Sequence, residues 1–83
     1  MYCIYILYSE KLDRFYVGST NNLERRLSEH NRKKGKFTDS GIPWKIVYSE
    51  HFDTNLEAIQ REREIKDRKS RKYILELIQK SGR

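Results

Sequence analysis

The feature that most constrains the fold is an apolar stretch near the start of the chain, residues 2–8 with the sequence YCIYILY. It is rich in aromatic and β-branched residues, which favour a β-strand. Alternation puts Cys3, Tyr5 and Leu7 on one face and Ile4 and Ile6 on the other, so both faces are apolar. The pattern predicts a central strand that is buried on both sides.

The length and charge of the chain narrow the class of protein. The chain has 83 residues, so we expect one small domain, residues 1–83, with one core. Its net charge is +6, but its apolar residues fall in short periodic blocks, which favours a folded domain over a disordered basic tail. Such a charge is common in proteins that bind DNA, RNA or anionic lipid, and it also occurs as a solubilising surface.

Several classes are excluded by what the sequence lacks. The only cysteine, Cys3, cannot form an internal disulfide, and two scattered histidines with one cysteine make no zinc site. No apolar run approaches the ~20 residues of a membrane span. The N-terminus has no signal-peptide pattern. We therefore expect a soluble, cytoplasmic protein without a membrane partner.

A hairpin and a first helix follow the opening strand. Residues 9–14 are polar and suit a hairpin loop, and residues 15–17 return as an antiparallel strand. Gly18 closes this strand and allows close backbone approach or a positive φ. Asn21 is the expected N-cap of the helix, with Glu24 completing a variant capping box. One side of this helix combines Leu23, Arg26, Leu27 and His30.

The second half of the chain adds one strand and two helices. Pro43 precedes a third strand, Trp44–Phe52, in which Trp44, Ile46 and Tyr48 are expected to share one face. The motif Thr54-x-x-Glu57 predicts a helix that runs to about residue 66, and Ser70 can cap a last helix. Residues 81–83 are expected to fray. The last helix presents Tyr73, Ile74, Leu77 and Ile78 on one face.

This order is strand, strand, helix, strand, helix, helix. It predicts an α+β fold in which a three-stranded antiparallel sheet is flanked by helices.

Glu62 is the residue that the fold explains least. It lies in the middle of the apolar sector formed by Ala58, Ile59 and Ile65, whereas the residues around it point elsewhere, namely Gln60, Arg61, Arg63 and Glu64. A carboxylate there costs several kcal/mol unless it is paired or binds a cation. Its side chain can escape to solvent, pair with an arginine of the first helix, or bind a hard cation such as Mg²⁺.

Other polar residues allow both a structural and a chemical interpretation. Arg26 is either the partner of Glu62 or a ligand for phosphate, which its planar guanidinium fits. His30 either caps its helix or donates to the same phosphate. Tyr5 and Tyr16 lie on neighbouring strands and belong either to the core or to a general-base site.

The order and spacing of these residues resemble those of the GIY-YIG nuclease superfamily. The pattern begins with Cys3-Ile4-Tyr5 and continues with Tyr16-Val17-Gly18. Arg26, His30 and Glu62 follow in helical contexts. The chain is similar, over residues 2 to about 78, to the small stand-alone members of this superfamily, which have a three-stranded antiparallel sheet flanked by helices.

The resemblance implies cleavage of DNA phosphodiester bonds with one divalent metal, Mg²⁺ or Mn²⁺. It implies that Glu62 is the metal ligand and that Arg26 stabilises the pentavalent phosphate. Tyr16 would be the favoured general base, and Tyr5 would orient the phosphate or the water and could exchange roles with it. His30 occupies a position where members use histidine or tyrosine.

The chain departs from the family pattern in three respects. Cys3 replaces the first glycine of the name motif, which still fits a strand. The asparagine that many members have after the glutamate helix is absent from residues 66–72, where a lysine is a possible substitute. We expect no additional DNA-recognition domain, and therefore weak binding with little sequence preference unless a partner helps.

Basic residues near these motifs are candidates for contacts with the nucleic-acid backbone, and each is equally compatible with a solvated surface. Gly18 would let the backbone approach the scissile strand. The candidates are Gly18, Arg25, Arg32, Lys33, Lys34, Lys36, Lys69 and Lys72.

Three functions remain open. The first is an endonuclease acting on DNA, branched or damaged DNA included. The second is a catalytically silent nucleic-acid-binding domain, and the third is a basic RNA- or ribosome-associated protein. The sequence favours the first, because Tyr5, Tyr16, Arg26 and Glu62 are all present. The sequence does not predict an oligomeric state.

Overall fold

The computed structural model describes residues 1–81, so the expected fraying of Gly82 and Arg83 lies outside the described residues, and Ser81 ends the last helix. The described residues form one three-stranded antiparallel sheet with strand order β2-β1-β3, which places the apolar strand at the centre as predicted. The elements are β1 (Tyr2–Ser9), β2 (Arg14–Thr20), α1 (Leu23–His30), a short 3₁₀ helix η1 (Phe37–Gly41), β3 (Trp44–Phe52), α2 (Asn55–Arg68) and α3 (Arg71–Ser81). This order confirms the predicted α+β fold.

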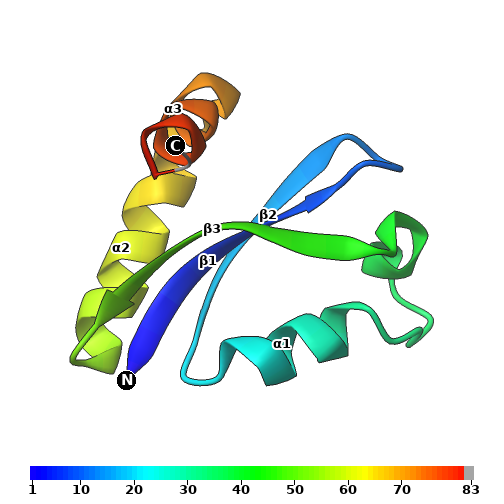
Figure 1. The fold of residues 1–83 in the computed structure, drawn as a ribbon, viewed down its shortest axis with the longest axis horizontal. Coiled ribbons are helices and arrows are strands. Elements are labelled where there is room, and N and C mark those ends of the chain that lie inside the picture. Colours follow the sequence, from blue (N-terminus) through cyan, green and yellow to red (C-terminus); the bar gives the residue numbers. More distant parts are fainter. Residues whose placement is uncertain (82–83) are drawn as a thin grey trace.

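Helices cover the sheet from two sides (Figure 1): α1 lies on one side, and α2 and α3 lie on the other. On the α1 side, Tyr5, Leu7 and Trp44 form a buried cluster. On the α2 side, Ile4 and Ile6 pack with residues of α2 and α3. The alternation predicted for the central strand is therefore confirmed, and both of its faces are buried.

One prediction for β3 is wrong. Trp44 belongs to the cluster on the α1 side, whereas Tyr48 packs on the α2 side, so these residues do not share a face. The pairing of β1 with β3 shifts between Ile6, opposite Tyr48, and Leu7, opposite Ile46. This irregularity puts one extra residue into β3, and an extra residue inverts the alternation beyond it.

The start of α1 also differs from the prediction. The strand β2 does not end at Gly18 but continues to Thr20. Asn22, not Asn21, is the N-cap, and its side chain accepts a hydrogen bond of 3.1 Å from the backbone N–H of Arg25. The Thr20 hydroxyl accepts a hydrogen bond from the backbone N–H of Asn22, which fixes the turn one residue later than expected.

The capping residues of the two later helices are confirmed. Thr54 and Glu57 form the predicted capping box at the start of α2. The Ser70 hydroxyl accepts a 3.1 Å hydrogen bond from the backbone N–H of Tyr73 at the start of α3. Because α2 continues to Arg68, it is slightly longer than the sequence predicted.

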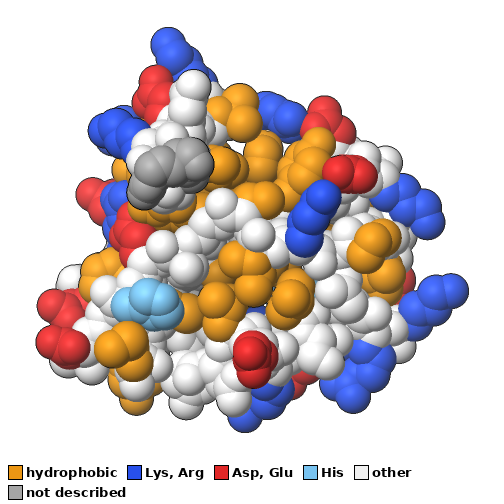
Figure 2. Space-filling view, viewed as in Figure 1, with side chains coloured by type: hydrophobic (Ala, Val, Ile, Leu, Met, Phe, Trp, Pro, Cys, Tyr) orange, Lys and Arg blue, Asp and Glu red, His pale blue; other side chains and the backbone are white. Residues whose placement is uncertain are grey.

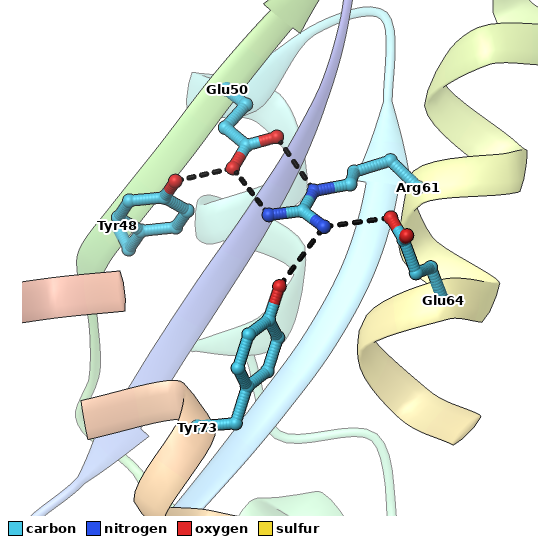
Figure 3. Close-up of polar contacts among 5 residues, drawn as sticks. All are labelled: Tyr48, Glu50, Arg61, Glu64 and Tyr73. Atoms are coloured by element: carbon cyan, nitrogen blue, oxygen red, sulfur yellow. Dashed lines mark hydrogen bonds and ion pairs between the residues drawn. The ribbon is translucent and has the colours of Figure 1, made fainter. Parts of the chain in front are cut away.

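A polar network ties β3, α2 and α3 together (Figure 3). Arg61 donates from Nε and Nη2 to the two carboxylate oxygens of Glu50, at 2.9 and 3.0 Å. Its Nη1 donates to Glu64 at 2.7 Å and to the Tyr73 hydroxyl at 3.1 Å, and the Tyr48 hydroxyl donates to Glu50. This network fixes the position of α2 on the sheet, although periodicity alone placed Arg61 away from the core.

The face of the molecule seen in Figure 2 is not strongly basic. Hydrophobic side chains gather at its centre, while lysine and arginine side chains lie mostly around its outline.

Candidate active site

The candidate site lies on the edge strand β2, around Gly18. Tyr5 of the central strand pairs with Gly18 across the ladder. A Cβ atom on Gly18 would lie 2.5 Å from the Tyr5 hydroxyl oxygen, so only glycine leaves room for the tyrosine. Of the two alternatives expected for Gly18, close approach is the one observed, because within residues 1–81 the only glycine with a positive φ is Gly35. Gly18 is therefore needed for space.

Two tyrosines and a histidine meet on the α1 side of this edge. The Tyr5 hydroxyl lies 3.3 Å from His30 Nε2, and the ring centroids of Tyr16 and His30 are 4.6 Å apart. Tyr5 is only 1% exposed, whereas Tyr16 is 37% exposed. Water can thus reach Tyr16 but not Tyr5.

The environment fixes the protonation states of Tyr5 and His30. Burial raises the pKa of Tyr5 to about 12, although a hydrogen bond from Arg26 and its charge oppose the rise. Tyr5 therefore keeps its proton at neutral pH. Burial, followed by the positive charges of Lys34 and Arg26, lowers the pKa of His30 from its usual value of 6.5, so His30 is mainly neutral at pH 7.

Arg26 extends from α1 toward Tyr5 and has a hydrogen-bond donor that is not used within the described residues. Its Nε lies 3.2 Å from a carboxylate oxygen of Glu29, in an ion pair on the helix surface. The angle of this contact makes no hydrogen bond, and the buried Nε has no hydrogen-bond partner among the described residues. A buried donor without a partner is rare in native proteins and indicates a ligand or ordered water.

Glu62 reaches the edge of β2 from the other side of the sheet. Its side chain is 20% exposed and forms a 2.6 Å ion pair with Lys66, one turn later on α2. Burial opposes its ionisation, but hydrogen bonds from Lys66 and Ser19 and the charges of Lys66 and Arg26 outweigh burial and lower its pKa. Glu62 is thus ionised, and it neither escapes fully to solvent nor has Arg26 as its ion-pair partner.

These residues converge from both layers on one short segment of β2. Ser19, whose hydroxyl helps to lower the pKa of Glu62, is the neighbour of Gly18, which faces Tyr5. The charge of Glu62 acts on the Tyr5 hydroxyl, and that of Arg26 acts on both groups. Sequence reasoning gave Ser19 no role, and only strand alternation, which places it on the side of α2, could have suggested one.

The donor set suits a hard cation with few protein ligands. Among residues 1–81, no three His, Cys, Asp or Glu side chains gather as a metal cage. The ionised Glu62 is a single carboxylate that is partly exposed. Mg²⁺ is commonly held by one or two carboxylates together with waters and substrate phosphate, so Glu62 fits Mg²⁺ or Mn²⁺ and the set does not fit structural zinc.

The predicted nucleic-acid contacts fall into two separate groups. The loop after α1 is shaped by Asp39, whose Oδ2 accepts hydrogen bonds from the backbone N–H groups of residues 34, 35 and 36 at 2.9, 2.6 and 3.2 Å. Arg25 donates to Asn21 at 3.4 Å on α1. Lys69 and Lys72 lie at the corner between α2 and α3. The exposed members of the loop group are Arg32, Lys33, Lys34 and Lys36.

Comparison with known proteins identifies the family. Residues 1–74 match the GIY-YIG catalytic domain. The chain belongs to this family. Membership implies nuclease activity, with DNA as the expected substrate and a general dependence on divalent metal.

Similar proteins come from bacteria and archaea and carry the name UPF0213 protein. The protein of Clostridium perfringens is 43% identical over 76 residues, which cover 90% of this chain and 80% of the relative. That of Bacillus licheniformis is 41% identical over 70 residues, covering 81% and 72%. That of Natronomonas pharaonis is 44% identical over 55 residues, just under two thirds (65%) of each protein. No solved structure gives a significant match.

The described helices are not suited to spanning a membrane. No helix within residues 1–81 has both the length and the apolar character that crossing a bilayer requires.

Proposed function

We propose that the protein is a divalent-metal-dependent endonuclease that hydrolyses DNA phosphodiester bonds with little sequence specificity of its own. The observation that carries the proposal is the convergence of Tyr5, Arg26 and Glu62 on Gly18 and Ser19 from opposite sides of the sheet. In a purely structural set of residues we would expect the buried Nε of Arg26 to be hydrogen-bonded, whereas it has an ion pair with Glu29 but no hydrogen bond within residues 1–81.

Each residue has a role that suits its environment. Glu62 would hold Mg²⁺ or Mn²⁺, which supplies Lewis acidity at the phosphate and lowers the pKa of bound water when it is present. Arg26 donates to the non-bridging phosphate oxygens as negative charge develops on them. Both groups are charged at neutral pH and lie within electrostatic reach of one another.

The proton transfers fall to the tyrosines. The phenolate of Tyr16, which solvent can reach and which forms when the hydroxyl gives its proton to solvent, accepts a proton from the attacking water as the water oxygen bonds to phosphorus. The bond from phosphorus to the leaving sugar oxygen breaks, and that oxygen takes a proton from solvent. Tyr5, whose pKa is raised to about 12, stays protonated, and because it is only 1% exposed it would orient the water or phosphate indirectly, through His30 and Arg26. The neutral His30 holds both rings in place.

Cleavage assays test this function. Supercoiled plasmid, single-stranded oligonucleotides and branched duplexes are incubated with Mg²⁺ or Mn²⁺ and with wild type, Glu62→Gln or Tyr16→Phe. Wild type is expected to cut, and both variants to lose most activity. Glu76→Gln, which changes an exposed carboxylate on α3, is the matched control and should cut like wild type. The proposal fails if wild type cuts none of these substrates, or if Glu62→Gln cuts equally well.

A catalytically silent DNA-binding domain is the second candidate, because Lys66 already occupies Glu62 at 2.6 Å and any metal must compete with it. The two functions differ in one measurement. A silent domain binds DNA but cuts nothing with either metal, and its Glu62→Gln variant binds as well as wild type.

A further inference from the structure

A second concave surface adjoins the candidate active site along the outer edge of β2. This groove, here called the β2–α3 groove, has a volume of about 280 Å³ and lies between β2 and the corner where α2 meets α3. Lys66 lines it and also pairs with Glu62, so the groove continues directly from the proposed metal ligand. Its rim carries the basic residues Arg14, Lys66, Lys69 and Arg71.

The charge of the rim indicates an anionic ligand. Among residues 1–81, the only carboxylate that lines the groove is that of Asp13, which pairs with Arg71 at 2.7 Å in an exposed and therefore weak ion pair. Arg14 and Lys69 form no ion pair within residues 1–81. Unpaired basic side chains around a concavity favour phosphate.

The backbone at the corner adds to this potential. Lys69 adopts a left-handed conformation, with φ of 49°, and turns the chain from α2 into α3. The first turn of α3 therefore borders the groove, and the N–H groups of a helix start attract negative charge. The N–H groups at the start of α3 add to the positive potential of the rim, which comes mainly from its basic side chains.

The floor of the groove is apolar, which phosphate binding alone does not require. Phe15 and Ile74 contribute to it, and the guanidinium carbon of Arg71 lies 5.0 Å from the centroid of the Phe15 ring. Bases of single-stranded nucleic acid stack on aromatic rings and on arginine side chains. A base in a duplex is already stacked and has no need of such a floor.

We propose that the β2–α3 groove holds one unpaired nucleotide of a DNA strand, next to the bond that the candidate active site cuts. The base lies against the guanidinium of Arg71, which covers the Phe15 ring, while Tyr8 packs on that ring with the ring centroids 4.9 Å apart. The phosphate lies between Arg14 and Lys69. The position of the cut rests on the proposed nuclease function, whereas binding in the groove does not. The preferred substrate is then DNA with a single-stranded segment beside the cleavage point.

Binding in the absence of divalent metal tests the groove independently of cleavage. The double variant Arg14→Ala/Lys69→Ala is compared with wild type by fluorescence anisotropy of a short single-stranded oligonucleotide in EDTA, over a range of salt concentrations. We expect a loss of affinity of about tenfold, and a salt slope reduced by about 0.7 for each phosphate contact removed. The control, Lys11→Ala/Lys80→Ala, removes two exposed lysines that do not line the groove. An equal change in the two double variants overturns the proposal.

Binding to a duplex of the same length distinguishes recognition of an unpaired nucleotide from general contact with the DNA backbone. The groove variant should lose less affinity for the duplex than for the single strand, and equal losses would exclude the unpaired nucleotide. Phe15→Leu keeps an apolar floor but removes the ring, and it should weaken single-strand binding about threefold. Its circular dichroism melting curve shows whether it is folded, and unchanged binding by the folded variant would also count against the groove.

The two proposals can fail separately. If wild type cuts DNA and the groove variants bind and cut as it does, the groove proposal is wrong and the nuclease stands. If no DNA is cut but the groove variants lose single-strand affinity, the nuclease proposal is wrong and the groove stands.

Discussion

Two arginines at opposite sides of the sheet differ in how fully they are bonded. Arg61 donates to Glu50 through two hydrogen bonds, and also to Glu64 and Tyr73. Arg26 has one surface ion pair with Glu29, and its buried Nε has no hydrogen-bond partner within residues 1–81. Both side chains are long and permanently charged, so the difference lies in what surrounds them.

The contrast separates an arginine that holds the fold together from one that is ready for a ligand. A buried donor without a partner costs about 1–3 kcal/mol, and a ligand that satisfies it recovers that cost. The saturated Arg61 has little left to offer a ligand. We therefore expect a substitution of Arg26 to affect catalysis and one of Arg61 to affect stability.

The largest expected effect is on cleavage by Arg26→Ala. Removing a donor that stabilises developing charge typically lowers the rate by about 10²–10³-fold. Stability should change little, because the side chain lacks strong partners. Plasmid nicking rates and urea unfolding measure the two effects, and Arg25→Ala on the same helix is the control. A variant that cuts normally but unfolds readily would reverse the comparison.

Arg61→Leu should lower the free energy of unfolding by about 2 kcal/mol. Breaking a buried pair costs about 3–5 kcal/mol, and the side chains of Arg61 and Glu50 are 19% and 24% exposed, so a smaller loss is expected. Urea denaturation gives the value. Arg63→Leu, at an exposed position on α2, controls for the loss of a charge. Equal stability of the two variants would show that the Arg61 network contributes nothing.

Gly18→Ala should have a smaller effect, of about 1 kcal/mol, near the lower limit for overpacking. The new Cβ would lie 2.5 Å from the Tyr5 hydroxyl oxygen, which must move away from His30. Cleavage should fall while the domain stays folded. Gly35→Ala is the control for steric crowding, since nothing lies within 4 Å of a Cβ there. Its φ of 74° adds backbone strain, so it can lower stability but should not lower cleavage. Normal cleavage by folded Gly18→Ala would show that the position of Tyr5 is not critical.

The smallest expected effect is the contribution of Glu50 to the loss of stability at acidic pH. Burial opposes the ionisation of Glu50, but hydrogen bonds from Arg61 and Tyr48 and the charge of Arg61 outweigh it and lower the pKa below the usual 4.5. A lowered pKa means that this stabilisation is complete above pH 4.5 and is lost as the pH falls through the folded-state pKa. Urea midpoints measured from pH 7 to pH 3 should fall less steeply in Glu50→Gln than in wild type. An unchanged slope would contradict this origin.

Local patterns predicted much of the fold. The apolar run of β1 identified the central strand, and the motif beginning at Thr54 identified the start of α2. Alternation and helical periodicity also placed Tyr5, Arg26 and His30 where the structure brings them together. These predictions succeed because each depends on residues that are close in sequence.

Two of the failures concern contacts between distant segments, and a third concerns an ion pair within one helix. The face of Tyr48 depends on an irregularity in the pairing of β3 with β1, which no pattern within β3 reveals. The burial of Arg61 depends on Glu50 of another element, so helical periodicity could only place it outside the apolar sector. The sequence offered Arg26 as a partner for Glu62, but Lys66, one turn away on the same helix, forms the ion pair.

The Asp39 contacts have a consequence for the energetics of any ligand that meets the basic loop. Three successive backbone N–H groups are fixed by one carboxylate, whose pKa these bonds lower against the effect of burial. Fixing a backbone residue costs roughly 1–2 kcal/mol of conformational entropy. Here that loss occurs when the chain folds and not when a ligand arrives. The lysines of this loop are therefore presented on an ordered backbone, and their affinity for phosphate is not reduced by the need to order it.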